Sequence, residues 1–153
     1  MGDFEKILLT AAMTVLGGFL IHSASQLFLK LFIEPLQDFK KYKFEAISLL
    51  GFYSNKLNAR LKYDDSFDEK ERYYKAQDEI RLCAANLKSA YYSINPRFLA
   101  VFLRIIPNQE NFKQASRNLM SLSFLGSLNT EDTKASENYN RARNTVAMLG
   151  AEW

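Results

Sequence analysis

The sequence predicts an all-α protein in which an N-terminal transmembrane helix precedes a cytoplasmic bundle of four or five helices. Two observations support this fold class. The residues between Lys6 and Lys30 carry no formal charge, and apolar side chains then recur at helical spacing to the end of the chain. Six glycines and three prolines in 153 residues are too few for a fold rich in strands and turns. We therefore expect residues 1–35 to form a short leader and a transmembrane helix, and residues 36–153 to form a cytoplasmic helical domain.

The uncharged segment is long enough to cross a bilayer. As a helix, residues 7–29 would measure about 34 Å, compared with a hydrocarbon core of about 30 Å. The leader Met1–Lys6 is not basic, and no small-x-small cleavage site follows a short apolar segment, so a signal peptide fits poorly. Lys6 also occupies the Ser/Thr position of the myristoylation pattern. The sequence therefore predicts a retained membrane helix.

The flanking charges predict the orientation of this helix. Lys30, Lys40, Lys41 and Lys43 follow it, whereas Lys6 alone precedes it. The positive-inside rule places the C-terminal domain in the cytoplasm and the N-terminus outside. A single cysteine agrees with a reducing compartment.

Small and polar residues recur every four positions along the predicted span. Such residues on one helix face allow close approach and hydrogen bonding between helices. The alternative is that the later members already lie in the wet headgroup region. The predicted self-association face consists of Thr10, Thr14, Gly18, His22 and Gln26.

Pro35 marks the junction with the cytoplasmic domain, and we expect the residue before it to leave helical geometry or the helix to kink there. Ser66 and Glu69 form a capping box that predicts a helix start near Phe67. Asn95-Pro96 and Pro107-Asn108 each end one helix and begin the next. The expected helices cover 36–62, 67–94, 97–106, 109–125 and a last segment after 126–134 that Gly150 closes.

The chain contains few residues of the types that form catalytic or metal sites. One histidine and one cysteine argue against clustered metal ligands and nucleophilic triads. The acidic residues near 64–71 lack the oxygen spacing and the glycine of a calcium loop, and they are explained by solvation and helix capping. Cys83 lies on an apolar stripe and is expected to be a buried packing residue. We expect no enzymatic activity, no metal and no cofactor.

Residues 80–128 are strongly basic, with Glu110 as their single acid and with Tyr91, Tyr92 and Phe98 interleaved. Guanidinium groups and aromatic rings together suit an anionic ligand that carries stackable bases. Two alternatives remain open, namely pairing with the acidic block 64–79 on a neighbouring helix and contact with anionic lipid headgroups. The candidate ligand-binding residues are Arg81, Lys88, Tyr91, Tyr92, Arg97, Arg104, Lys113 and Arg117.

With this basic-aromatic block, the layout resembles small membrane-anchored helical effectors of bacterial antiviral defence. Among these it is similar to the cyclic-oligoadenylate-activated membrane proteins of type III CRISPR systems. The resemblance covers the architecture of the whole chain and has no diagnostic motif. It implies a homo-oligomer in the bacterial inner membrane whose cytoplasmic domains bind cyclic oligoadenylate and rearrange the membrane helices.

This chain departs from the resemblance in having one predicted span, since such effectors often have more. Duplex nucleic acid is not an expected partner. The alternative function is a membrane-tethered interaction module that recruits a protein partner without any ligand.

Overall fold

The computed structural model describes residues 2–54, 66–124 and 133–150. Within these ranges all regular structure is helical, which confirms the all-α class. The elements are α1 (Asp3–Phe28), the π-helical turn η1 (Leu29–Ile33), α2 (Glu34–Phe52), α4 (Phe67–Ser93), α5 (Arg97–Phe102), α6 (Gln109–Leu122) and α7 (Thr133–Met148).

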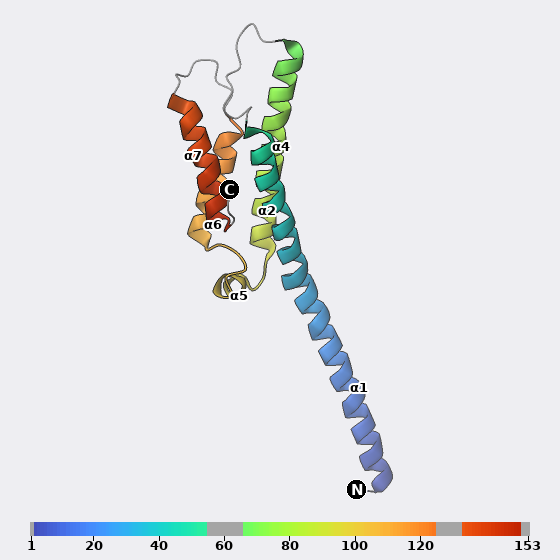
Figure 1. Ribbon diagram of the computed structural model, residues 1–153. Helices are drawn as coiled ribbons and strands as arrows, with labels where there is room; N and C mark the ends of the chain where they lie inside the picture. The colour runs from blue at the N-terminus through green and yellow to red at the C-terminus, as the bar shows by residue number, and fades with distance from the viewer. Residues whose placement is uncertain (1, 55–65, 125–132, 151–153) are drawn as a thin grey trace.

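The first three elements form one uninterrupted helix, Asp3–Phe52, whose first half projects away from the bundle (Figure 1). Of the two alternatives expected at Pro35, the departure of Glu34 from helical geometry is therefore wrong. Glu34 keeps right-handed helical angles (φ −60°, ψ −51°), and its N–H donates to the carbonyl of Leu29 in a π-type bond. The wider turn accommodates the proline ring without ending the helix.

Pro35 has no N–H for the carbonyl four residues earlier, that of Leu31. That carbonyl instead accepts a hydrogen bond of 3.0 Å from the backbone N–H of Asn95, which follows α4. The carbonyl that cannot receive the proline's missing N–H thus becomes an attachment point for the bundle.

The bundle consists of α2, α4, α6 and α7, with α2 packed on α4, α4 on α6 and α6 on α7 (Figure 1). The predicted capping box of α4 is confirmed, because the Ser66 hydroxyl accepts from the Glu69 N–H at 3.3 Å and the Glu69 carboxylate accepts from the Ser66 N–H at 3.2 Å. Large side chains that are almost fully buried include Phe39, Leu50, Ile80, Leu87, Tyr91, Phe112, Leu119, Leu122, Val146 and Leu149.

Several helix ends differ from the expected ones. The α5 helix stops at Phe102 rather than at residue 106, because Arg104 adopts a left-handed conformation with φ 56°. Gly150, also left-handed with φ 72°, follows α7 as expected. The parts of the predicted helices and connections at 55–65 and 125–132 lie outside the described residues.

The α1 helix exposes apolar side chains on all sides, and none of its residues is buried. Ile7, Phe19 and Ile21 are each about two-thirds exposed or more, at 68%, 66% and 71%. By length and composition, the helix that begins at Asp3 is able to cross a membrane, a property that an N-terminal signal sequence shares.

Candidate ligand-binding surface

The candidate ligand-binding residues lie mainly on the antiparallel pair α4 and α6. A guanidinium nitrogen of Arg81 lies 3.4 Å from the carbonyl oxygen of Ser123, at the end of α6. The ring of Tyr92 lies 6.1 Å from that of Phe112, near the start of α6. These two contacts set the register, in which Lys88 is level with the middle of α6.

Three exposed cations share this level, and we refer to Lys88, Lys113 and Arg117 as the basic face. Lys113 and Arg117 are four residues apart on α6, so they are neighbours on the helix surface. In the part of the chain that the structure describes, none of the three forms an ion pair. Glu110 is the one acid of α6. The basic face therefore presents cationic charge that its own surroundings leave unneutralised.

Arg81 is engaged by other groups of the protein. It forms an ion pair of 3.1 Å with Asp78, and its guanidinium lies 4.9 Å from the ring centroid of Phe124. This ion pair joins two residues of α4, so it differs from the pairing with a neighbouring helix that the sequence left open.

Arg97 is held at the corner between α4 and α5. Its guanidinium lies 4.8 Å from the ring centroid of Tyr92 and 5.4 Å from that of Tyr91. One nitrogen donates to the carbonyl of Tyr92 at 3.1 Å, whereas the buried ε-nitrogen has no hydrogen-bond partner among the described residues. The two rings stabilise the cation through cation–π contacts, which gives Arg97 a role in fixing the corner.

Tyr91 and Tyr92 face different surroundings. Tyr91 is fully buried, its ring stacks on Phe112 at 3.7 Å, and its hydroxyl donates to the carbonyl of Pro107 at 3.2 Å. Burial raises the pKa of this hydroxyl. We therefore assign Tyr91 to the core, because its ring is closed to an external ligand. Tyr92 is 39% exposed and remains next to the basic face.

Arg104 lies two residues after α5, which is at the end of the bundle from which α1 leaves (Figure 1) and apart from the basic face on α4 and α6. Arg81 lies near the middle of α4, level with the end of α6. The predicted ligand residues thus divide into a basic face, a corner at Arg97, an engaged Arg81 and a separate Arg104.

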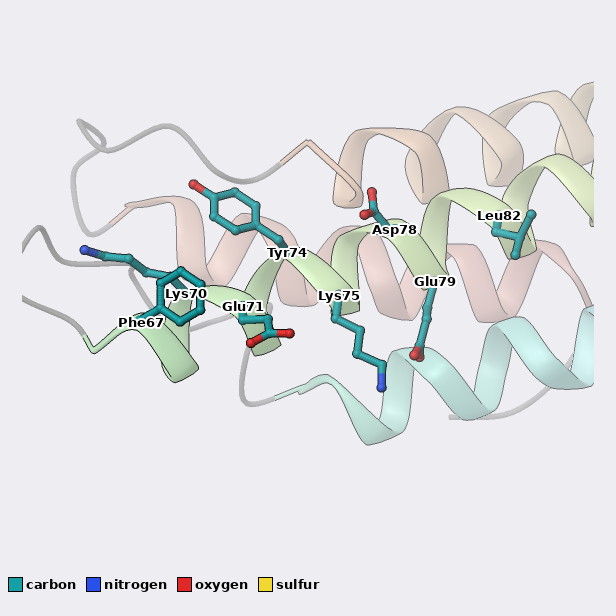
Figure 2. A pocket seen from close by; sticks show the side chains of 8 residues that line it. All are labelled: Phe67, Lys70, Glu71, Tyr74, Lys75, Asp78, Glu79 and Leu82. Carbon is teal, nitrogen blue, oxygen red and sulfur yellow. The ribbon is translucent and has the colours of Figure 1, made fainter.

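A hollow of about 680 Å³ lies along the first half of α4, and Figure 2 shows the eight side chains that line it. They include the acids Glu71, Asp78 and Glu79 together with two lysines and exposed apolar groups. All of this described lining comes from one helix, so it defines no enclosed geometry for a ligand. Among the described residues no group of acids, histidines or cysteines could hold a metal ion.

The predicted self-association stripe on α1 is exposed along its length. The hydroxyl of Thr10 donates to the carbonyl of Lys6 at 2.8 Å, and that of Thr14 donates to the carbonyl of Thr10 at 2.9 Å. A Cβ atom added at Gly18 would meet nothing within 4 Å. Within this single chain His22 and Gln26 are exposed, and association through the stripe stays a prediction.

Comparison with known protein families, curated proteins and solved structures gives no match for this chain. The functional assignment therefore depends on the geometry of the molecule itself.

Proposed function

We propose that this protein is a membrane-anchored helical receptor in which α1 spans the bilayer and the cytoplasmic bundle responds to an anionic ligand. The observation that supports it most directly is the single helix Asp3–Phe52, which joins an exposed apolar half to a half packed in the bundle. An exposed apolar helix of this length needs a lipid or protein environment.

Retention of α1 as an anchor is favoured over its removal as a signal sequence. Phe32, only three residues beyond the uncharged segment, is 4% exposed and belongs to the core. The carbonyl of Leu31 bonds to Asn95. Cleavage just after the apolar segment would therefore cut the helix on which the bundle is assembled.

The basic face is the proposed ligand site. Lys88, Lys113 and Arg117 supply donors suited to phosphate oxygens, and Tyr92 offers a partly exposed ring beside them. The resemblance to antiviral membrane effectors suggests cyclic oligoadenylate as the ligand, since it combines phosphates with stackable bases.

The bundle offers a route from this site to the membrane. A ligand that bridges α4 and α6 would favour one arrangement of these helices, and α4 leads directly to the Asn95–Leu31 bond at the base of α1. In a homo-oligomer associated through the α1 stripe, ligand binding would bias the arrangement of the membrane helices.

The test uses the full chain in lipid nanodiscs, with thermal unfolding measured against cyclic di-, tri-, tetra- and hexa-adenylate. Ligand at 100 times its dissociation constant should raise the free energy of unfolding by about 2.7 kcal/mol. The double variant Lys88→Glu/Lys113→Glu should lose this shift. Lys40→Glu is the matched control, because Lys40 is an exposed lysine on α2, away from the basic face.

A stabilisation that disappears in the double variant and persists in the control supports the proposal. A flat response of the wild-type protein to every ring size would reject cyclic oligoadenylate and favour the tethered interaction module. The exposed apolar residues Phe67, Tyr74 and Leu82 along the α4 hollow are the feature that favours this second function.

A further inference from the structure

The short helix α5 exposes large apolar side chains that no described element covers. Phe98 is 76% exposed and Phe102 is 81% exposed, and their spacing of four places them on one helix face. Leu103 directly after them is 52% exposed. On the opposite side, Ala100 is fully buried in the core. The α5 helix is therefore anchored by one face and presents apolar groups outward on the other.

The outward face of α5 lies close to the point at which α1 leaves the bundle. The α5 helix lies at the end of the bundle from which α1 departs (Figure 1). The hydrogen bond from Asn95 to the carbonyl of Leu31 places the start of α5 beside the residue that follows Lys30. Lys30 is the first charge after the apolar segment, so it marks the level at which a spanning α1 would leave the hydrocarbon core.

The charges around α5 complement an anionic lipid surface. Arg97 and Arg104 flank the helix, and no acidic residue occurs between positions 94 and 109. Arg104 is exposed and has no ion pair to another described residue. It occupies a left-handed position where glycine is the usual residue, so a residue with a side chain costs backbone energy there.

We propose that α5 is a second membrane contact. Phe98, Phe102 and Leu103 insert into the interfacial region of the leaflet that α1 enters, and Arg104 binds the phosphates of anionic lipids. This inference rests on the proposed membrane span of α1. If both contacts form, the bundle is held against the bilayer at α1 and at α5, and these two points fix the orientation of the bundle relative to the membrane.

The test is fluorescence quenching by lipids brominated at shallow acyl positions, using the full chain in phosphatidylglycerol/phosphatidylcholine nanodiscs. Single tryptophans are introduced as Phe98→Trp and Phe102→Trp in a Trp153→Phe background. The matched control is Phe67→Trp, because Phe67 is 80% exposed at the other end of α4. Phe19→Trp, near the middle of the apolar segment, reports the span itself and is measured with lipids brominated at deep acyl positions.

We expect both α5 tryptophans and the α1 tryptophan to be quenched at least about twofold more than the Phe67 control. Quenching in α1 but not in α5 would overturn the second contact and leave the span intact. A blue-shifted but unquenched α5 tryptophan would mean that a second copy of the chain covers the face, which also overturns the proposal. Absence of quenching in α1 would reject the span, and the proposed function with it.

Discussion

Replacement of Arg104 by glycine should make the protein more stable although it removes a charged side chain. Arg104 follows α5 with φ 56°, its N–H donates to the carbonyl of Val101 at 2.9 Å, and the N–H of Ile105 donates to that of Ala100 at 3.0 Å. These two bonds define a Schellman motif, in which glycine is favoured because it has no Cβ.

The size of the effect follows from two opposing terms. A left-handed conformation costs a residue with a Cβ about 1–2 kcal/mol, whereas glycine gives the unfolded chain extra entropy of about 0.4–1 kcal/mol. Their difference predicts that Arg104→Gly raises the free energy of unfolding by roughly 0.5–1 kcal/mol. For a chain of this size the Tm should rise by about 1–4 °C.

The assay is thermal and urea unfolding of the full chain in a neutral detergent. Arg104→Ala is the matched control, because it removes the same guanidinium and retains the backbone cost, so its stability should change by less than about 0.5 kcal/mol. Equal stabilities for the two variants, or a less stable glycine variant, would refute the left-handed assignment. In nanodiscs both variants should reduce the dependence of Phe98→Trp quenching on anionic lipid.

Two further predictions concern buried groups of the bundle. The Tyr53 hydroxyl donates to the Glu79 carboxylate at 2.7 Å, and this bond, assisted by burial, raises the pKa of Tyr53 to about 12. Tyr53→Phe should therefore lower the free energy of unfolding by about 1–2 kcal/mol in urea titrations at neutral pH. The deficit should shrink as the pH rises above about 10, where the unfolded tyrosine ionises, and a deficit unchanged up to pH 11 would count against the bond. Burial raises the pKa of the Cys83 thiol to about 12. At pH 8, a soluble maleimide should therefore label Cys83 in the folded protein at least about tenfold more slowly than in the urea-unfolded protein. Equal labelling rates would show that solvent reaches the thiol in the folded protein.

Local patterns were sufficient to predict most of the helical elements. The four residues Tyr73, Ile80, Leu87 and Ile94, spaced by seven in the sequence, are all buried in the structure. The capping box at Ser66 forms as expected. Such patterns depend on neighbours within a few residues, so they can be recognised in the sequence without knowledge of the tertiary fold.

The sequence was less informative where a residue's role depends on a distant partner. Lys43 lies seven residues from the buried Leu36 and seven from the buried Leu50, so it interrupts an apolar stripe of α2. Its ammonium donates to the carbonyl of Gly150, 107 positions away, at 3.2 Å. Partial burial, with the nearby charge of Lys40, lowers the pKa of Lys43. Likewise, adjacent positions in the sequence did not reveal that Tyr91 faces the core while Tyr92 remains partly exposed.

The candidate ligand-binding site was likewise predictable only in part from the sequence. The excess of basic residues over 80–128 could be read directly, but the sequence could not show which cations are already engaged. Arg81 pairs with Asp78 three residues earlier, which a helical pattern could have suggested. The separation of Arg104 from the basic face depends on α5 turning across the end of the bundle. Asn95-Pro96 predicts the break between α4 and α5, but no local pattern specifies the direction of α5.

The junction at Pro35 determines how a signal could reach the membrane. Had the helix broken there, α1 would have been joined to the bundle by a hinge, and ligand binding would have had little effect on its orientation. The π-helical turn instead keeps α1 and α2 in one helix, and the Leu31 carbonyl accepts its bond from the corner that follows α4. The α4 helix carries Lys88 of the basic face and leads to Asn95. A change in the position of α4 must therefore either move the base of α1 or break the hydrogen bond between Asn95 and Leu31. The proline, which predicted a break or a kink in the helix, is therefore the residue that makes mechanical coupling between the proposed ligand site and the proposed span possible.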